Sequence, residues 1–382
     1  MDSGIATARE SRYQAIHTVL RRRIVEGRLQ PGDRLPTRDD LCSELSASKI
    51  TVQRALEQLA SEGMVVARGR AGTFVKQQPQ SNTVGLVFSF EQHDPSWDYS
   101  PYLNTLVRQA ALLGQASADR PACKIKVYYG VTDPWSPDQP QGLADDLKHG
   151  RLAGLIVVPT IKPWAPSAPL NLPVVSLGRL SNMSPDESAI RFSWESWCEH
   201  AIELLVQGDC KRLAILAAAV RPAAEIDKLA DLARQRGILI KPQWVQGIYP
   251  DQADWARRSV HLLVDRDSPQ APDTLLITDD SLIDQASAGL VDAGVRSPNQ
   301  LRVVTWANLP SRSPRLLPMT RLGFDLRSAL VQAVDLITRK RLGQAVERSI
   351  ALPVQVEDQQ QAGVSEPVSM SRSISESVSE SV

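Results

Sequence analysis

The sequence predicts an α/β protein with a small helical domain at its N-terminus and a larger body built on parallel β-sheets. Apolar residues recur at three- and four-residue spacing near the N-terminus, as on one face of a helix. From about residue 83, short unbroken apolar runs alternate with helical stretches, a pattern typical of strands covered by helices on both faces. The 382 residues allow two or three domains.

Charge is distributed unevenly along the chain. The 43 Lys and Arg balance the 43 Asp and Glu, so the net charge is zero. Residues 1–80 nevertheless carry thirteen basic against nine acidic side chains, which gives a basic N-terminal part and a mildly acidic remainder.

Cysteine usage and hydropathy favour a soluble cytoplasmic protein. The cysteines are scattered and show neither a CxxC motif nor a neighbouring His pair at metal-ligand spacing. No apolar run reaches the length of a membrane span, and the N-terminus lacks the apolar core of a signal peptide. We therefore expect reduced thiols, and neither a metal nor a cofactor.

Three helices are expected in the N-terminal part. Ser11–Glu26 shows an apolar stripe and is followed by Gly27, a common helix terminator. Thr37 can cap a short second helix, with acidic residues in its first turn. A third helix begins near Ser48 after a tight turn and ends at Gly63.

A two-stranded wing is expected after the third helix. The segments 64–67 and 73–76 flank the turn RGRAG, so they read as a short hairpin. Three helices followed by such a hairpin describe a winged helix-turn-helix, whose recognition helix enters the major groove of DNA.

The string GRLQPGDRLPTRDDLCSELSASKITVQRALEQLASEGMVVARGRAGTFV closely resembles the DNA-reading domain of the GntR family of bacterial transcription regulators. The resemblance covers nearly all of residues 11–76 and is most specific in PGDRLP, in the TVxxALxxLxxEG rhythm and in AGTFV. It implies a double-stranded DNA operator as the partner. The residues expected to contact it are Arg38, Ser48, Lys49, Thr51, Gln53, Arg54, Arg70 and Gly72.

Within this set, Lys49 and Gln53 occupy positions that often hold base-contacting Arg in the family, and Gly72 lies at the wing tip. One departure matters: the family usually has LPSERELA where this chain has LPTRDDLC, so Asp39 stands where Arg is expected. The operator is then expected to differ from the family's commonest one. The alternative is that these charges form only a solvated helix face, with Arg38 or Arg54 in surface ion pairs.

Residues 77–82, reading QQPQSN, are expected to form a linker, and the body follows from residue 83 to 363. The segments expected to be strands are Val84–Phe88, Ile125–Tyr129, Leu155–Val158, Val174–Leu177, Leu213–Leu216, Leu275–Ile277 and Val303–Thr305. Those expected to be helices are Leu103–Leu113, Glu195–Val206, Ile226–Arg236, Asp254–Val264, Leu282–Ala293 and Leu326–Arg341.

The order of motifs in the body resembles the effector domain of the LacI family, which shares the fold of periplasmic sugar-binding proteins. The motifs are AGLIVVP, LPVVSLGR, KRLAIL, the stretch PDTLLITDDSLIDQASAGLVDAGVRSPNQLRVVTW, and a closing helix ending in RKRLG. The resemblance spans about residues 83–356 and is looser than the N-terminal one. It implies two α/β lobes joined by three crossovers, with a ligand cleft between them at the carboxyl ends of strands.

Several positions at which the LacI family holds sugar hydroxyls differ in this chain. The Asp and Asn of the family's VxxDN motif correspond to Ser193 and Trp194. The Arg that the family has at the start of the next lobe's first helix corresponds to Glu225, and the Asp of its VVGFDN motif corresponds to Ala307. Charged groups make the strong, directional hydrogen bonds that small sugars need, so a monosaccharide is expected to bind weakly. The residues expected to bind an effector, a sugar or a derivative of one, are Tyr102, Ser193, Trp194, Asp280 and Trp306.

Two alternatives remain open for the cleft. The tryptophans can stack on a ligand, or they can fill the core between the lobes. The cleft can also have decayed to a dimerisation scaffold.

No catalytic motif is evident. The five His residues are dispersed, and there is no GxSxG, HExxH or Walker-type loop, so an enzyme is not expected. Residues 364–382 contain eight serines and are expected to be a disordered tail.

These observations predict a cytoplasmic, homodimeric transcription regulator that responds to a ligand and controls sugar or related catabolic genes. A repressor is favoured over an activator. Its dimer is expected to bind a pseudo-palindromic operator. The alternatives are an effector-blind DNA-binding protein whose body only dimerises, and a carbohydrate-binding module with a vestigial N-terminal domain.

Overall fold

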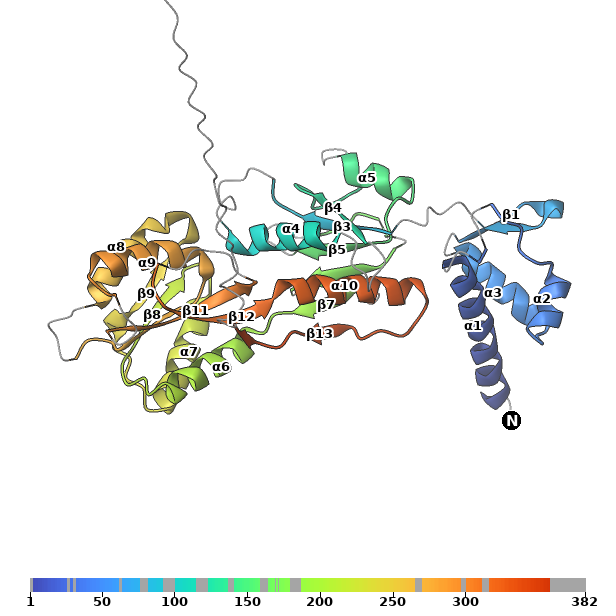
Figure 1. Cartoon of the computed structure of the whole chain (residues 1–382). Helices are drawn as coiled ribbons and strands as arrows, with labels where there is room; N and C mark the ends of the chain where they lie inside the picture. The colour runs from blue at the N-terminus through green and yellow to red at the C-terminus, as the bar shows by residue number, and fades with distance from the viewer. Residues whose placement is uncertain are drawn as a thin grey trace, which may run out of the picture.

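The computed structural model describes most of the chain (Figure 1). The described residues are 3–25, 28–29, 32–61, 64–75, 82–91, 100–114, 123–136, 141–158, 164–168, 170, 172–178, 187–264, 270–296, 300–310 and 316–357. The predicted linker, except for residue 82, and the predicted Ser-rich tail lie outside this set.

The N-terminal domain is the predicted winged helix-turn-helix. Its helices are α1 (Ser3–Val25), α2 (Arg38–Glu44) and α3 (Lys49–Ser61). The wing pairs β1 (Val65–Ala67) antiparallel with β2 (Thr73–Val75), and the 3₁₀ turn Gly69–Ala71 lies between them. Helix α1 starts at Ser3 rather than at the predicted Ser11.

One apolar core holds this domain together. Ile16, Leu20 and Ile24 of α1 pack with Val52 and Leu59 of α3 and with the wing. The apolar face of α3 packs in this core, so the opposite face of the helix is exposed to solvent.

The N lobe of the body is a six-stranded parallel sheet in the order β13-β7-β6-β5-β3-β4. Its strands are β3 (Thr83–Phe88), β4 (Lys124–Tyr128), β5 (Gly154–Val158), β6 (Val174–Leu177), β7 (Ser188–Arg191) and β13 (Ser349–Ala351). Its helices are α4 (Pro101–Leu113), α5 (Gln141–Lys148) and α10 (Leu326–Arg341). Helix α10 packs against α4 and against β5, β6 and β7.

The C lobe repeats this arrangement in the order β14-β12-β11-β10-β8-β9. Its strands are β8 (Leu213–Ala218), β9 (Val245–Ile248), β10 (Thr274–Ile277), β11 (Arg302–Leu309), β12 (Thr320–Asp325) and β14 (Gln355–Val356). Its helices are α6 (Trp194–Gln207), α7 (Ala223–Gln235), α8 (Asp254–Leu263) and α9 (Ile283–Asp292), and 3₁₀ turns cover Pro242–Trp244, Pro250–Gln252 and Asp280–Leu282. Only β14 runs antiparallel, at the edge beside β12.

The central strands of both sheets are buried on both faces, as their unbroken apolar runs predict. In β5, Ile156 packs in one core and Val157 in another, and in β8 Ile215 and Leu216 divide in the same way. Alternate residues of a strand point to opposite faces, so each face needs its own cover of helices.

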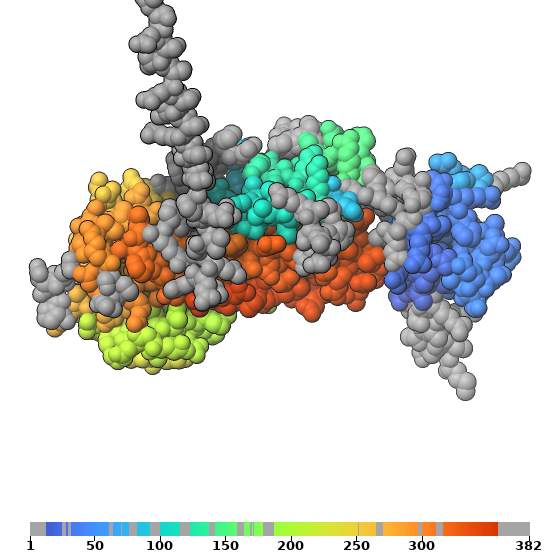
Figure 2. All heavy atoms as spheres, viewed as in Figure 1, coloured from blue at the N-terminus to red at the C-terminus, as the bar shows by residue number. Residues whose placement is uncertain are grey.

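The chain passes between the lobes three times, after β7, after β12 and after β13. One apolar core runs through both lobes, from Leu86 and Ile190 in the N lobe to Ile215 and Phe324 in the C lobe. The space-filling view shows α10 (orange-red) against the teal surface of the N lobe (Figure 2). Among the described helices, none combines the length and apolarity that crossing a bilayer requires.

The strands and helices named from the sequence are all present, and apart from the earlier start of α1 their ends shift by a few residues. The sequence missed α5, β7, β9, β12, β13 and β14. These segments are short or interrupted by polar residues. For example, β12 contains Arg321 and Gly323, which obscure its apolar run.

Position 323 requires glycine because the backbones of β12 and β11 approach closely there. Gly323 pairs with Ala307 of β11, and a Cβ at Gly323 would lie 1.7 Å from the Ala307 carbonyl oxygen. Only glycine therefore lets β12 lie in its observed position, next to the crossover into α10.

We expect Gly323→Ala to lower the free energy of unfolding by at least about 2 kcal/mol, because backbone atoms must move apart to accept the methyl group. Urea unfolding monitored by circular dichroism measures the change. Gly247→Ala on β9 is the matched control, since its Cβ would meet only the Ala219 Cβ at 3.7 Å. Equal midpoints for the two variants would contradict this account.

Candidate functional site

The N-terminal end of α3 is built by side-chain capping. The Ser48 hydroxyl accepts a hydrogen bond from the Thr51 amide (3.3 Å) and lies 2.7 Å from the Thr51 hydroxyl. Such caps satisfy amide groups that the first turn leaves without partners. Ser48 and Thr51 therefore fix where the recognition helix begins.

The other predicted α3 contacts lie on its solvent side, and two of them are paired with acids. The Lys49 Nζ is 2.6 Å from Asp39 Oδ1 of α2, and the Gln53 Nε2 donates to Glu57 Oε1 at 2.6 Å. The hydrogen bond and charge of Asp39 raise the pKa of Lys49. Arg54 is exposed on the same helix.

Helix α2 presents its first turn beside this face. The Thr37 side chain accepts from the Asp40 amide while the Asp40 carboxylate accepts from the Thr37 amide, which forms a capping box. Arg38 is exposed at the first position of the helix. Thr37 and Asp40 complete the cap, so the neighbouring Asp39 side chain is left for Lys49.

The wing tip places Gly72 at a positive φ of 107°. A Cβ there would lie 2.7 Å from the Arg34 Nε, so the tip packs closely on this side chain. Arg68 lies over the Phe74 ring at 5.1 Å from its centroid. The side chain of Arg70 lies outside the described set.

The structure thus brings Ser48, Lys49, Thr51, Gln53 and Arg54 together on α3 and its cap, whereas Arg38 lies at the first position of α2. Asp39, the partner of Lys49, is not among the DNA contacts predicted from the sequence, although the departure from the family at this position is evident there.

A second group of predicted residues gathers where the lobes meet. We call it the interlobe aromatic cluster, and it consists of Tyr102, Phe192, Trp194, Trp197, Trp306 and Phe324. Adjacent rings have centroids 5.1 to 6.3 Å apart. The rings come from α4, the first crossover, α6, β11 and β12, so both lobes contribute to the cluster.

Trp197 anchors this cluster. Its indole is fully buried, and its Nε1 donates to the Leu322 carbonyl at 2.8 Å. A buried indole N–H needs such an acceptor. Helix α6 is thereby fixed to β12.

Both faces of Trp194 are covered in this conformation. Trp197 stacks on it at 5.2 Å and 14°, and the Arg221 guanidinium lies 3.6 Å from the Trp194 ring centroid. These two groups cannot occupy the same face. A ligand can therefore stack on Trp194 only if Arg221 moves.

Arg221 is a candidate site residue that sequence reasoning missed. It follows β8, forms an ion pair with Glu225 at 3.0 Å, and also lies 6.0 Å from the Trp306 ring centroid. The sequence analysis expected an Arg at position 225. Arg221 lies just beyond the carboxyl end of the parallel strand β8, and this position in the sequence is the signal that would have identified it as a site residue.

Asp280 lies in the 3₁₀ turn that contacts both α4 and β11. The Asn308 Nδ2 donates to its Oδ2 at 2.7 Å. Burial, reinforced by the charge of Asp279, raises the pKa of Asp280 to about 7. This carboxyl group therefore changes its charge near neutral pH.

The two remaining predicted effector residues have clear local roles. Ser193 caps α6 by accepting from the Ser196 amide at 3.1 Å. Tyr102 packs edge-on against Phe192, and burial raises the pKa of its phenol. The structure thus brings Tyr102, Ser193, Trp194, Asp280 and Trp306 to the region between the lobes.

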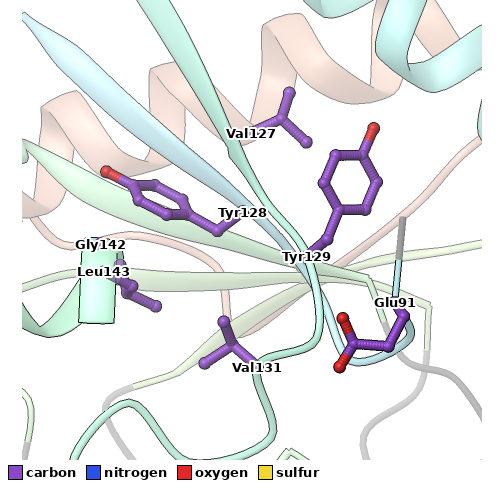
Figure 3. Close-up of a pocket in the computed structure, with 7 residues that line it drawn as sticks. All are labelled: Glu91, Val127, Tyr128, Tyr129, Val131, Gly142 and Leu143. Atoms are coloured by element: carbon purple, nitrogen blue, oxygen red, sulfur yellow. The ribbon is translucent and has the colours of Figure 1, made fainter. Parts of the chain in front are cut away.

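A separate cavity of about 320 Å³ lies in the N lobe at the carboxyl end of β4 (Figure 3). Glu91, Tyr128, Tyr129 and Leu143 are among its lining residues. None of the predicted effector residues lines it. Across the described residues, no group of three or more His, Cys, Asp or Glu is arranged to hold a metal ion.

Comparison with protein families identifies the N-terminal domain. Residues 12–75 match the family model described as bacterial regulatory proteins of the gntR family. The mannosyl-D-glycerate transport/metabolism system repressor MngR of Escherichia coli is 34% identical over 80 residues, or 21% of this chain and 33% of that protein. The arabinose metabolism transcriptional repressor of Geobacillus stearothermophilus is 31% identical over 72 residues, or 18% of this chain and 20% of that protein. The matches therefore span about a third or less of these relatives' lengths.

Solved structures match the body instead. A Burkholderia thailandensis protein described as a ribose operon repressor aligns with a TM-score of 0.52 and 15% identity, covering 72% of this chain and 99% of that one. The regulator CelR in complex with cellobiose aligns with a TM-score of 0.51 and 17% identity, covering 81% and 89%. Identities this low establish the fold alone. Residues 12–75 therefore form a GntR-type winged helix-turn-helix, and the body that follows has the fold of LacI-family regulators.

Proposed function

We propose that this chain is a transcription regulator that binds DNA through its winged helix-turn-helix and responds to a small molecule bound between its lobes. The observation that carries the proposal is the joining of a GntR-type reading domain to a body with the LacI-regulator fold. We further propose that it acts as a cytoplasmic repressor without enzymatic activity.

A sugar or a sugar derivative is the effector class best supported. Relatives of the N-terminal domain are named for mannosyl-D-glycerate, fructoselysine and arabinose metabolism, and a structural neighbour of the body is complexed with cellobiose. In this chain Arg221 lies over Trp194 and near Trp306 between the lobes, and we propose that the ligand binds beside them. Aromatic faces and a guanidinium favour a ligand with an apolar face and an acceptor or anionic group.

Coupling between effector and DNA needs two conformations that bind the effector with different affinities. The three crossovers are the connections about which the lobes can move. In the present conformation the interlobe aromatic cluster packs on itself, and Arg108 of α4 donates to the Pro310 carbonyl in the C lobe at 2.9 Å. An effector would displace some of these contacts and so change the angle between the lobes.

We also propose that two copies act together on a pseudo-palindromic operator. Two reading domains related by a two-fold axis match half-sites one helical turn apart, or a multiple of it.

The effector proposal is tested by thermal unfolding of the full chain with mono- and oligosaccharides, sugar acids, sugar phosphates and nucleosides. A ligand at a hundredfold its Kd stabilises the folded state by about 2.7 kcal/mol, which raises Tm by several degrees. For a ligand whose acceptor or anionic group bonds to the guanidinium, Arg221→Ala is expected to abolish that rise. Arg258→Ala, which removes a similar Arg–Trp contact on the exposed face of α8, is the matched control and should retain it. A flat panel with DNA binding intact would contradict the effector and favour a body that only dimerises.

The reading face is tested by selecting DNA from a randomised duplex library and measuring affinity for the selected site at several salt concentrations. Arg54→Ala should weaken binding to all sequences and reduce the slope of log affinity against log salt by about one, because one phosphate contact is lost. Lys49→Ala should instead lose about tenfold affinity for the selected site and relax its sequence preference at one position. Unchanged affinity for both variants would refute this reading face.

Asp280 predicts a specific pH dependence of stability. Its folded-state pKa of about 7 lies above the ordinary value of 3.8, so the folded protein holds a proton that the unfolded chain releases. The free energy of unfolding should therefore fall as pH rises from about 4 to about 7. Asp280→Asn is expected to remove this fall in urea titrations, whereas Asp231→Asn, an exposed carboxylate on α7, should leave it unchanged. Parallel pH profiles for wild type and Asp280→Asn would disprove the assignment.

A further inference from the structure

We infer that Asp39 and Lys49 act together as a composite reader of one G·C base pair in a fixed orientation, with Lys49 on the guanine and Asp39 on the cytosine. This inference rests on the proposed DNA binding and goes beyond it, because it assigns a base contact to an acidic residue.

The first argument is that the pair has little to do with folding. Both side chains are about three-quarters exposed, with relative exposures of 75% and 74%, and Lys49 Nζ lies 2.6 Å from Asp39 Oδ1. Exposed ion pairs contribute little to stability. Thr37 and Asp40 already cap α2, so Asp39 is not needed for the cap. What the pair does is place one donor and one acceptor side by side at the start of α3.

The second argument is geometric. In the major groove, guanine presents the acceptors O6 and N7, and its paired cytosine presents the N4 donor. O6 and N4 are joined by a Watson–Crick hydrogen bond, so they are separated by about 2.9 Å, the usual donor–acceptor distance. The Lys49 ammonium and the Asp39 carboxylate are separated by nearly the same distance. The ammonium can therefore donate to guanine while the carboxylate accepts from cytosine.

The third argument is discrimination. In the reversed C·G pair, the ammonium would face the N4 donor and the carboxylate would face the O6 acceptor, so both contacts would be repulsive. An A·T pair would fail in the same way. A T·A pair presents the matching order of acceptor and donor, but thymine lacks the second acceptor that guanine offers to Lys49 and places a methyl group there.

A carboxylate beside DNA also carries a cost on every other sequence, because its charge repels the phosphates and no cytosine amino group offsets that repulsion. Asp39 therefore lowers non-specific affinity while favouring the matched pair. An Arg at this position, as is usual in the family, would instead attract the phosphates of any sequence.

The test selects sites from a randomised duplex library with the full-length wild type, Asp39→Ala and Glu44→Gln. Glu44 is the matched control, since it is also an ion-paired acid of α2 but bonds to Arg23 of α1 at 2.6 Å. We expect the wild type to select a G·C pair of fixed orientation in each half-site. Asp39→Ala should lose about tenfold discrimination against C·G at that position alone. It should also bind unrelated DNA more tightly. Glu44→Gln should retain the wild-type preference.

A reciprocal exchange gives an independent readout. The double variant Asp39→Lys, Lys49→Asp reverses the donor and the acceptor while keeping the net charge, so its selected sites should carry C·G at the same position. Circular dichroism confirms that the variant is folded, and both positions are exposed.

Three outcomes would overturn the inference. One is an Asp39→Ala variant with every base preference of the wild type. Another is an equal gain of affinity for all sequences, which would assign Asp39 a purely electrostatic role. The third is an exchange variant whose selected orientation is unchanged. If the wild type selects no sequence at all, the proposed DNA binding itself fails, and this result is distinct from the other three.

Discussion

The packing of aromatic rings between the lobes is the interaction on which the rest of the body depends. Each lobe buries the central strands of its own sheet on both faces, but the apolar core that continues from one lobe to the other passes through the crossovers. Trp197 is fully buried there and bonds to the Leu322 carbonyl, while Trp306 and Phe324 extend the contact along β11 and β12. The same rings therefore stabilise the body and line the region where an effector would bind.

This double role has a mechanistic consequence. A charged, hydrated cleft can open and close without losing packing, whereas an aromatic cluster that covers its own faces must exchange those contacts for contacts with the ligand. Arg221 is the group best placed for such an exchange, because it covers the outer face of Trp194 and is paired with Glu225 near the surface. The cost of breaking the stack would make the response selective for ligands that replace it.

The reading domain follows a different physical rule. Its core is apolar and uses one face of each helix, so the chemistry of the opposite face is free to vary without loss of the fold. On that face Asp39 and Glu57 accept from Lys49 and Gln53, which gives alternating donors and acceptors in place of uniform positive charge. Such a surface favours discrimination between base pairs over simple attraction to phosphates.

The sequence by itself determined the winged helix-turn-helix, the parallel sheets and the order of most elements. Periodicity, caps and apolar runs are local properties, and PGDRLP and AGTFV are contiguous motifs. It could not determine β12 or β14, whose short or polar segments become strands only beside their neighbours. The tertiary structure alone decided that Trp194 is covered on both faces, that Arg221 lies over it, and that Asp39 bonds to Lys49. These contacts join residues from different elements, and their geometry depends on how those elements pack.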